Sequence, residues 1–370
     1  MPPPASERRS DSPAEVEVLV VGGGQAGLAA GYYLRRAGAD FVILDAQERP
    51  GGAWRHAWPS LRLFSPAQYS SLPGRMMPST SDGGYPTAAH VVGYLADYEE
   101  RYRLPVRRPV TVEAVRRGDR GLLVDTDAGR WGAQVVISAT GTWWRPYVPF
   151  YPGAADFAGR QLHAADYTGP DEFAGRRVVV VGGGNSAAQI LAEVSTVAET
   201  TWVARRTPRL LPDEVDGKAL FDMATRRVRG EAGAGGGGGL GDIVAVPPVR
   251  DARERGVLKA QPMFSRITAG GIAWADGAES ACDAILWCTG FRPELRHLTP
   301  LRLRTHDGVI ATVGTRAEDE PRLHLLGYGN WTGPASATLI GAGRTARDTV
   351  AEVVTQLADL REEPARRGDQ

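Results

Sequence analysis

The chain has 370 residues and carries 43 basic and 43 acidic side chains, which give a formal net charge of zero. A balanced charge argues against a protein that neutralises nucleic-acid phosphates, and a hydrophobic content of 42% argues against disorder. The two cysteines, Cys282 and Cys288, and the lack of a long apolar run argue against a disulfide scaffold, a metal module and a membrane span. We expect a cytoplasmic protein of two or three domains, with its oligomeric state open and a homodimer as one candidate.

Both ends of the chain are expected to be tails. Residues 1–14 contain charges but no apolar run or cleavage pattern, so they predict a disordered tail and not a signal peptide. Residues 359–370 have the same character.

The first predicted unit is a strand, a glycine turn, a helix and a second strand. An apolar run at 16–21 leads into Gly22, Gly24 and Gly27, which form the pattern GxGxxG, and a second apolar run ends at Asp45. The glycines permit a tight turn, a close approach of a pyrophosphate and close packing of helix on strand. A carboxylate about 20 residues further on can bind the ribose hydroxyls. The pattern therefore predicts a dinucleotide site, whereas a flexible loop without ligand would need no such surroundings.

Two further motifs accompany this turn. The sequence GGAW places Gly51, Gly52 and Trp54 soon after the second strand, and another strand runs into a glycine turn at Ala139–Gly141. A matching strand and turn span Ala284–Phe291. We expect these two strand-plus-turn motifs to be places where the chain crosses between two nucleotide-binding domains. Ordinary strand ends would have the same sequence.

A second strand and glycine turn begin at residue 177. The fingerprint is now GxGxxA, and the positions assigned to the cofactor are Gly182, Gly184, Asn185, Ser186 and Ala187. Where the first copy ends in Asp45, the second runs into Arg205 and Arg206. A guanidinium pairs with a 2′-phosphate that a carboxylate would repel, so the pattern predicts NADP(H) at the second site. Solvated surface arginines are the alternative interpretation.

A third motif lies between the copies. Phe157, Gly159, His163 and Tyr167 follow the pattern FxGxxxHxxxY. With GGAW, the two glycine turns and the ATG motif, it resembles the flavin-containing monooxygenases, the class B single-component flavoprotein oxygenases. Thr168 departs from the Lys or Arg that usually follows this signature. Similarity to a compact bacterial subgroup, which includes arsenic-operon-associated relatives, is carried by segments 60–74, 85–87 and 325–341.

The resemblance implies an α/β fold with two Rossmann-like dinucleotide-binding domains, the NADP domain being inserted into the FAD domain. The expected boundaries are 15–150 and 290–358 for the two parts of the FAD domain and 151–289 for the NADP domain. The glycine-rich stretch 231–242 is expected to be a flexible surface loop.

The resemblance also implies the chemistry. FAD on the first turn takes hydride from NADPH, or from NADH, held on the second, and then reacts with O2. A flavin C4a-(hydro)peroxide passes one oxygen atom to a soft nucleophile such as a sulfide. Weak Baeyer–Villiger activity is a further expectation, and the physiological substrate stays open among sulfides, amines, ketones and organoarsenicals.

Residues near the flavin are assigned from the same resemblance. His56 and Phe64 are the predicted catalytic residues. The residues expected to bind FAD, besides those of the first fingerprint, are Gly51, Gly52, Trp54, Ala139, Gly141 and Asn330. Larger family members carry an asparagine where Phe64 stands. Because a phenyl ring has no hydrogen-bond donor, we expect much of the reducing power to leak to hydrogen peroxide. His163 is expected to hold a linker by hydrogen bonds rather than to act in catalysis.

Two other functions stay open. A disulfide reductase shares the plan of two nucleotides, but it needs a close cysteine pair beside the flavin, and Cys282 and Cys288 have five residues between them. A non-catalytic redox sensor would bind the nucleotides and signal to a partner. Oxidation of sulfides would separate the oxygenase from both alternatives.

Overall fold

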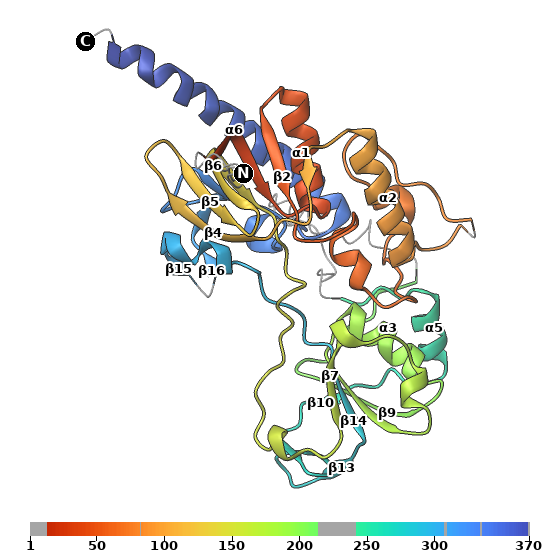
Figure 1. Cartoon of the computed structure of the whole chain (residues 1–370). Helices are drawn as coiled ribbons and strands as arrows, with labels where there is room; N and C mark the ends of the chain where they lie inside the picture. The colour runs from red at the N-terminus through yellow and green to blue at the C-terminus, as the bar shows by residue number, and fades with distance from the viewer. Residues whose placement is uncertain (1–12, 82, 214–241, 307–308, 334, 369–370) are drawn as a thin grey trace, which may run out of the picture. The chain divides into compact units, whose positions relative to one another are not determined.

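The computed structural model describes residues 13–81, 83–213, 242–306, 309–333 and 335–368, with side chains up to residue 362. The chain forms two compact units. The first unit contains residues up to 52, residues 95–141 and residues from 295 onward, and the second contains residues 53–94 and 142–294. Each unit has its own central sheet (Figure 1).

A mixed sheet forms the centre of the first unit. Its five central strands are parallel, in the order β19-β6-β1-β2-β3, while β18 and β17 extend one edge and β5 and β4 pair beyond β6, all antiparallel. A two-stranded hairpin, β15 with β16, lies outside it. The strand bounds are β1 Ala14–Val21, β2 Phe41–Leu44, β3 Val106–Arg107, β4 Val112–Arg117, β5 Leu122–Thr126, β6 Gly129–Ser138, β15 Thr305–His306, β16 Val309–Ile310, β17 Thr312–Val313, β18 Arg316–Ala317 and β19 Leu323–Leu325.

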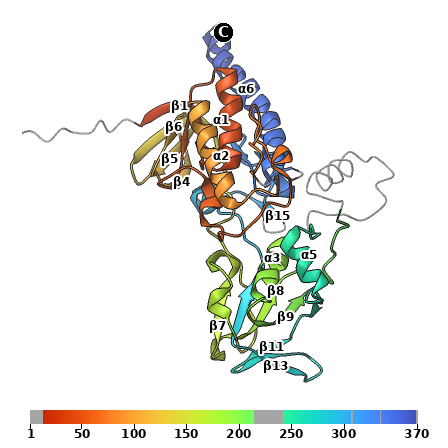
Figure 2. The same ribbon diagram turned by 90° about the vertical axis from the view of Figure 1, so that its right-hand side faces the viewer.

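Helices cover one face of this sheet. Helix α1 (Gln25–Ala37) packs against α6 (Leu339–Gly368), and both views show the two side by side (Figures 1 and 2). Helix α2 spans Ala88–Arg101. The opposite face is apolar as well, with Leu19, Val21 and Val136 buried against Val115 and Leu298. The unit is therefore a three-layer structure.

The predicted tail at 359–370 is wrong for the described residues, because α6 continues to Gly368. Ala342, Ala346, Val350, Val353 and Leu357 are buried at helical spacing. The residues that follow Leu357 include strong helix formers, which carry the helix onward.

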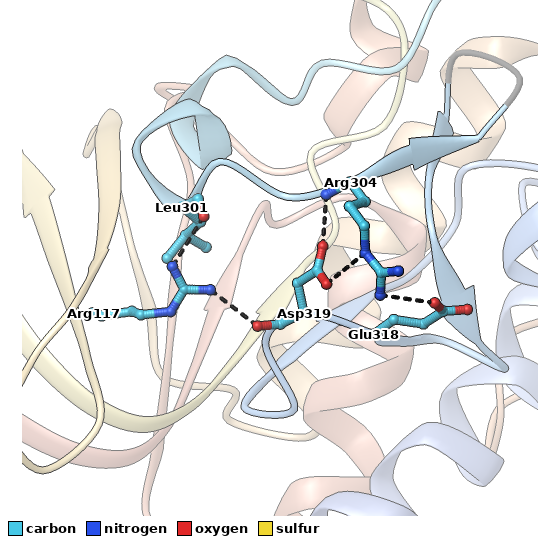
Figure 3. A network of polar contacts seen from close by, with 5 residues as sticks. All are labelled: Arg117, Leu301, Arg304, Glu318 and Asp319. Atoms are coloured by element: carbon cyan, nitrogen blue, oxygen red, sulfur yellow. Dashed lines mark hydrogen bonds and ion pairs between the residues drawn. The ribbon is translucent and has the colours of Figure 1, made fainter.

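Surface arginines join distant parts of the chain within the first unit (Figure 3). The Arg117 guanidinium, at the end of β4, donates to the carbonyl oxygens of Leu301 and Asp319, each at 3.0 Å. Arg304 donates to the Asp319 carboxylate at 2.8 Å and to Glu318 at 3.3 Å. Both arginine side chains are more than half exposed. Each ion pair that they form therefore contributes little to the stability of the fold, about 0–1 kcal/mol.

The second unit contains a parallel sheet in the order β10-β9-β8-β14-β7 and a small antiparallel sheet, β11-β12-β13. Its helices α3 and α5 lie side by side (Figure 2). The bounds are β7 Arg160–His163, β8 Arg177–Val181, α3 Asn185–Val194, β9 Glu199–Ala204, α5 Pro247–Glu254, β10 Gln261–Pro262, β11 Arg266–Thr268, β12 Gly271–Ala273, β13 Glu279–Ala281 and β14 Ala284–Trp287.

Both faces of the parallel sheet are buried. Val178 and Val180 of β8 join the core that contains the α3 residues, while Val179 and Val181 join a second core with Phe264. Alternate residues of a strand point to opposite faces, so a continuous valine run is what a sheet covered on both sides requires.

The observed units differ from the predicted domain boundaries in one large respect. Residues 53–94, expected in the FAD domain, pack with the second unit. Trp58 is buried in the core of that unit, and the Gln189 amide of α3 exchanges two hydrogen bonds with the backbone of Arg62, at 3.1 and 3.2 Å. The return to the first unit occurs at 295 rather than 290, because Gly290 accepts from the Tyr147 N–H at 2.9 Å.

Two further expectations concern a membrane span and the glycine-rich stretch. In the described part of the chain no helix is both long and apolar enough to cross a membrane. The glycine-rich stretch at 231–241 lies outside the described residues.

Candidate cofactor sites

The first glycine turn follows β1 directly and leads into α1. Gly22 has φ 109°, and a Cβ atom there would lie 2.5 Å from the carbonyl oxygen of Ala139. A Cβ on Gly27 would lie 1.9 Å from the Gly22 oxygen. Both positions therefore require glycine, Gly22 for conformation and contact and Gly27 for helix packing.

The second glycine of the fingerprint, Gly24, faces open space. A Cβ on Gly24 would meet nothing closer than the Gly52 Cα, at 4.0 Å, and Gly24 is the N-cap residue of α1. Gly51 and Gly52 both have positive φ and are buried. The turn and the start of α1 thus leave room for an anion at the positive end of a helix, which fits the pyrophosphate of FAD.

Asp45 lies at the carboxyl end of β2, beside the turn, and its side chain is 7% exposed. Its Oδ2 accepts from Arg108 at 3.0 Å, and Arg108 also binds Glu99 with two hydrogen bonds. The predicted ribose acceptor therefore has an ionic partner that the sequence motif did not reveal. Arg108 stands 63 residues from Asp45, too far apart for a local pattern to connect the two.

The ATG turn is held by hydroxyl groups. The Tyr328 hydroxyl lies 2.6 Å from Ser138 Oγ and 2.7 Å from Thr140 Oγ1, and Ser138 Oγ lies 3.0 Å from His297 Nε2. Gly141, the last residue of the motif, has φ 68°. The predicted FAD residue Ala139 thus contacts the first glycine of the turn and belongs to a fixed segment.

The segment that contains Asn330 rests on the start of α1. A Cβ on Gly327 would lie 2.6 Å from the Ala26 side chain, and Gln25 donates to the Ala337 oxygen at 2.6 Å. Asn330 begins a short 3-10 helix, η7 (Asn330–Thr332), and its side-chain oxygen accepts from the Ala335 N–H at 3.4 Å. Within the first unit, the structure therefore brings the late segment to α1, the helix that follows the first glycine turn.

The second glycine turn repeats the geometry of the first. Gly182 has φ 142°, and a Cβ there would lie 2.3 Å from the carbonyl oxygen of Cys288, which follows β14. A Cβ on Gly184 would meet no atom within 4 Å. Ala187 is buried, and Ser186 is exposed at the first turn of α3. Each predicted crossing motif therefore ends against the first glycine of one turn.

The Asn185 side chain has partners within the protein. Its side-chain oxygen accepts from the Val244 N–H at 2.9 Å, and its amide donates to the Asp242 oxygen at 3.2 Å. The side-chain amide thus holds the chain at 242–244, and the predicted contact of Asn185 with the cofactor stays a prediction. The local motif could not show this, because the partners lie more than 50 residues away.

Arg205 and Arg206 follow β9 and are exposed. A Cβ on Gly183 would lie 3.6 Å from the Ala204 side chain and 3.8 Å from the Arg206 oxygen. The strand end that carries the two arginines therefore borders the second turn, as Asp45 borders the first. This position suits contact with the ribose end of a bound dinucleotide.

His56 lies in an aromatic cluster of the second unit. It belongs to the 3-10 helix η1 (Gly52–His56), which also contains the half-buried Trp54, and stacks at 6.0 Å from Trp143. Trp143 stacks at 5.0 Å on Phe291. Burial and the neighbouring Arg55 lower the pKa of His56.

His163 of the family signature holds a linker, as expected. Its Nδ1 accepts from the Ala165 N–H at 3.0 Å, so Nε2 carries the proton that points to the Gly290 oxygen at 3.0 Å. Burial lowers the pKa of His163. Tyr167 ends the signature and donates from its hydroxyl to Glu193 at 2.9 Å. These contacts give the motif a structural role in joining β7, β14 and α3.

Phe64 is half-buried and packs against the core of the second unit. The hydrogen bonds between Gln189 and Arg62 hold the strand-like segment just before it. Its ring is therefore fixed on the unit that carries the second glycine turn.

The two cysteines do not form a redox pair. Both are free thiols, and burial raises the pKa of Cys282 to about 11 and that of Cys288 to about 12. A reactive dithiol needs a lowered pKa, so the disulfide reductase is disfavoured. Among the described residues, no cluster of His, Cys, Asp and Glu could hold a metal ion.

Comparison with known proteins identifies several relatives. Residues 19–219 match the family model described as pyridine nucleotide-disulphide oxidoreductase. A flavin-containing monooxygenase from Stenotrophomonas maltophilia is 53% identical, with a TM-score of 0.86, and the match covers 93% of this chain and 99% of that one.

The chain is also similar to curated proteins from other organisms. An uncharacterized CzcO-like oxidoreductase from Geobacillus kaustophilus is 31% identical over 283 residues, which cover 75% of this chain and 80% of that protein. The indole-3-pyruvate monooxygenase YUCCA1 of rice is 28% identical over 333 residues, 78% of this chain and 79% of that protein.

Proposed function

Because the chain belongs to the flavin-containing monooxygenases, within the wider pyridine nucleotide-disulphide oxidoreductase family, we propose that it transfers one oxygen atom from O2 to an organic sulfide. It is an FAD-dependent NAD(P)H monooxygenase. Sulfide, O2, NAD(P)H and one proton would yield sulfoxide, NAD(P)⁺ and water. Weak Baeyer–Villiger oxidation of ketones is part of the same proposal.

The observation that carries the proposal is the pair of matching glycine turns. Each has a first glycine pressed against a crossing strand and an open position at the start of a helix. The residues around the first turn fit FAD, and those around the second fit a nicotinamide dinucleotide. When bound, FAD would supply the hydride-accepting and O2-activating chemistry. The chain supplies binding, orientation and exclusion of water.

NADPH is the preferred coenzyme in this proposal. Arg205 and Arg206 are exposed at the edge of the second turn, where a 2′-phosphate would be neutralised. NADH would serve at higher concentration.

Phe64 is proposed to lie near the reacting groups and to limit coupling between NADPH use and product formation. A phenyl ring excludes water but cannot donate a hydrogen bond. Phe64→Asn is expected to raise the ratio of sulfoxide formed to NADPH consumed, since an amide can stabilise developing negative charge. Hydrogen peroxide and sulfoxide would be quantified together. An unchanged ratio would show that Phe64 acts only in packing.

The function is tested with oxygen isotopes. Purified protein reconstituted with FAD is given NADPH, ¹⁸O2 and thioanisole, and the sulfoxide is analysed by mass spectrometry. One ¹⁸O atom per sulfoxide and stimulation of NADPH use by the sulfide are expected. Slow NADPH oxidation without stimulation would favour a redox sensor, and reduction of a disulfide substrate would favour a reductase.

A further inference from the structure

A buried chain of three charged side chains lies beside the first glycine turn. Asp45 follows β2 and Arg108 follows β3, so both stand at the carboxyl ends of adjacent parallel strands. Glu99 comes from α2. Side-chain exposure is 7% for Asp45, 10% for Arg108 and 16% for Glu99, so solvent screens these charges weakly.

The geometry of this charged chain is specific. Arg108 Nη1 and Nη2 bind the two oxygens of Glu99 at 2.6 and 2.9 Å, and Arg108 Nε binds Asp45 Oδ2 at 3.0 Å. A bidentate pair of this kind holds the guanidinium plane in one orientation. The side of the guanidinium that faces Asp45 is therefore fixed by Glu99.

The same groups touch the glycine turn. A Cβ on Gly23 would lie 2.7 Å from Asp45 Oδ2 and 2.9 Å from Arg108 Nη2. The middle glycine of the GGG run is thus explained by side chains and not by turn conformation. It also shows that the Asp45 carboxylate reaches the turn where the dinucleotide would lie.

One oxygen of Asp45 is left with little to bind. Oδ2 is taken by Arg108, whereas Oδ1 accepts, within the described part of the chain, a single backbone N–H from Gln47 at 3.3 Å. That bond is long, and a carboxylate oxygen can accept two. Glu99 also offsets the positive charge of Arg108, so the three groups together keep one negative charge for a hydroxyl donor.

We propose that Arg108 and Glu99 are positioning residues that hold Asp45 so that its Oδ1 accepts the 2′-hydroxyl of the FAD adenosine ribose. The inference rests on FAD binding at the first turn, and it adds two residues that the fingerprint does not contain. Neither residue needs to touch the flavin ring.

The test compares FAD with an analogue whose adenosine ribose lacks the 2′-hydroxyl. The full-length protein is stripped of flavin, and the Kd of each ligand is measured by flavin fluorescence. A hydrogen bond to a charged group predicts that the wild type binds FAD roughly 10- to 150-fold more tightly than the analogue. Arg108→Met should reduce this ratio to about threefold or less and weaken the analogue far less than FAD.

Glu99→Gln keeps the shape of the site, and the same affinity ratio is measured with this variant if Arg108→Met does not fold. It should lower the ratio at least about threefold, and Arg108→Lys should restore part of the ratio lost in Arg108→Met. Arg116→Met is the matched control, because Arg116 binds Asp125 at 2.9 Å on the exposed surface of the same unit, and it should leave the ratio unchanged.

The outcomes separate the two levels of the proposal. Equal weakening of FAD and analogue in both variants would mean a purely structural role and would overturn it, as would wild-type protein that binds both ligands equally. A protein that binds neither ligand would overturn the FAD site itself, and with it the proposed function.

Discussion

The two glycine turns share a backbone and differ in their side chains. In each, the first glycine would clash with a crossing strand if it carried a Cβ, at Ala139 in one and Cys288 in the other. The first turn then meets the buried Asp45, and the second borders the strand end that carries the exposed Arg205 and Arg206. In the proposed function, the backbone makes each turn suitable for a dinucleotide, while the charge at the neighbouring strand end selects which dinucleotide binds.

The largest effect should come from filling the open position of either turn. Gly24→Val is expected to weaken FAD binding by about 100-fold or more, since loss of two charged hydrogen bonds already amounts to roughly 3 kcal/mol. The fold should survive, because the new Cβ meets no protein atom closer than 4.0 Å. Absorbance at 450 nm and circular dichroism measure flavin and fold.

Gly184→Val is the matched variant in the second turn. It should keep bound FAD and raise the KM for NADPH. Loss of flavin from both variants alike would contradict the assignment of separate cofactors to the two turns.

Substitutions at the third fingerprint position, Gly27 in the first turn and Ala187 in the second, should lower the free energy of unfolding by different amounts. Gly27→Ala places a Cβ 1.9 Å from the Gly22 oxygen, and such overpacking should destabilise by about 3 kcal/mol. Ala187→Gly removes one buried methyl and should cost about 1 kcal/mol. Urea unfolding followed by tryptophan and flavin fluorescence would measure both, and equal losses would refute the difference in packing.

Removing the positive charge at the second turn should change the choice of coenzyme. Arg205→Ala is expected to raise the KM for NADPH roughly 10- to 150-fold and leave NADH nearly unchanged. Arg206→Ala should have a smaller effect of the same kind. If both coenzymes weaken equally, the arginines act on protein stability and not on the 2′-phosphate.

The smallest effect concerns pH. Burial lowers the pKa of His163, so below about pH 6.5 the unfolded chain binds a proton that the folded chain resists. Stability from this group is complete above that pH and falls as the pH decreases. His163→Asn keeps an acceptor for the Ala165 N–H without titrating, so between neutral pH and about pH 5.5 its Tm should fall less than the Tm of the wild type. Parallel Tm curves would contradict the assignment.

Local patterns in the sequence predicted the two turns, the crossing motifs and the α/β class, because each is written in a short run of residues. Contacts between distant residues were not predicted. Arg108 reaches Asp45 across 63 positions, and Arg62 reaches Gln189 across 127. A single sequence holds no periodicity that links such positions, so the charged chain beside the first turn and the placement of residues 53–94 emerged only from the fold.

The membership of residues 53–94 in the second unit bears on how such genes can be recombined. A chimera that exchanges only residues 142–294 between two homologous chains would pair one parent's Trp58 with the other parent's Leu162 and Val180. Interiors are packed closely enough that mismatched neighbours lose stability. Productive crossover points therefore lie near residues 52, 94, 141 and 295. The two gene fragments that encode residues 53–94 and 142–294 should be exchanged together.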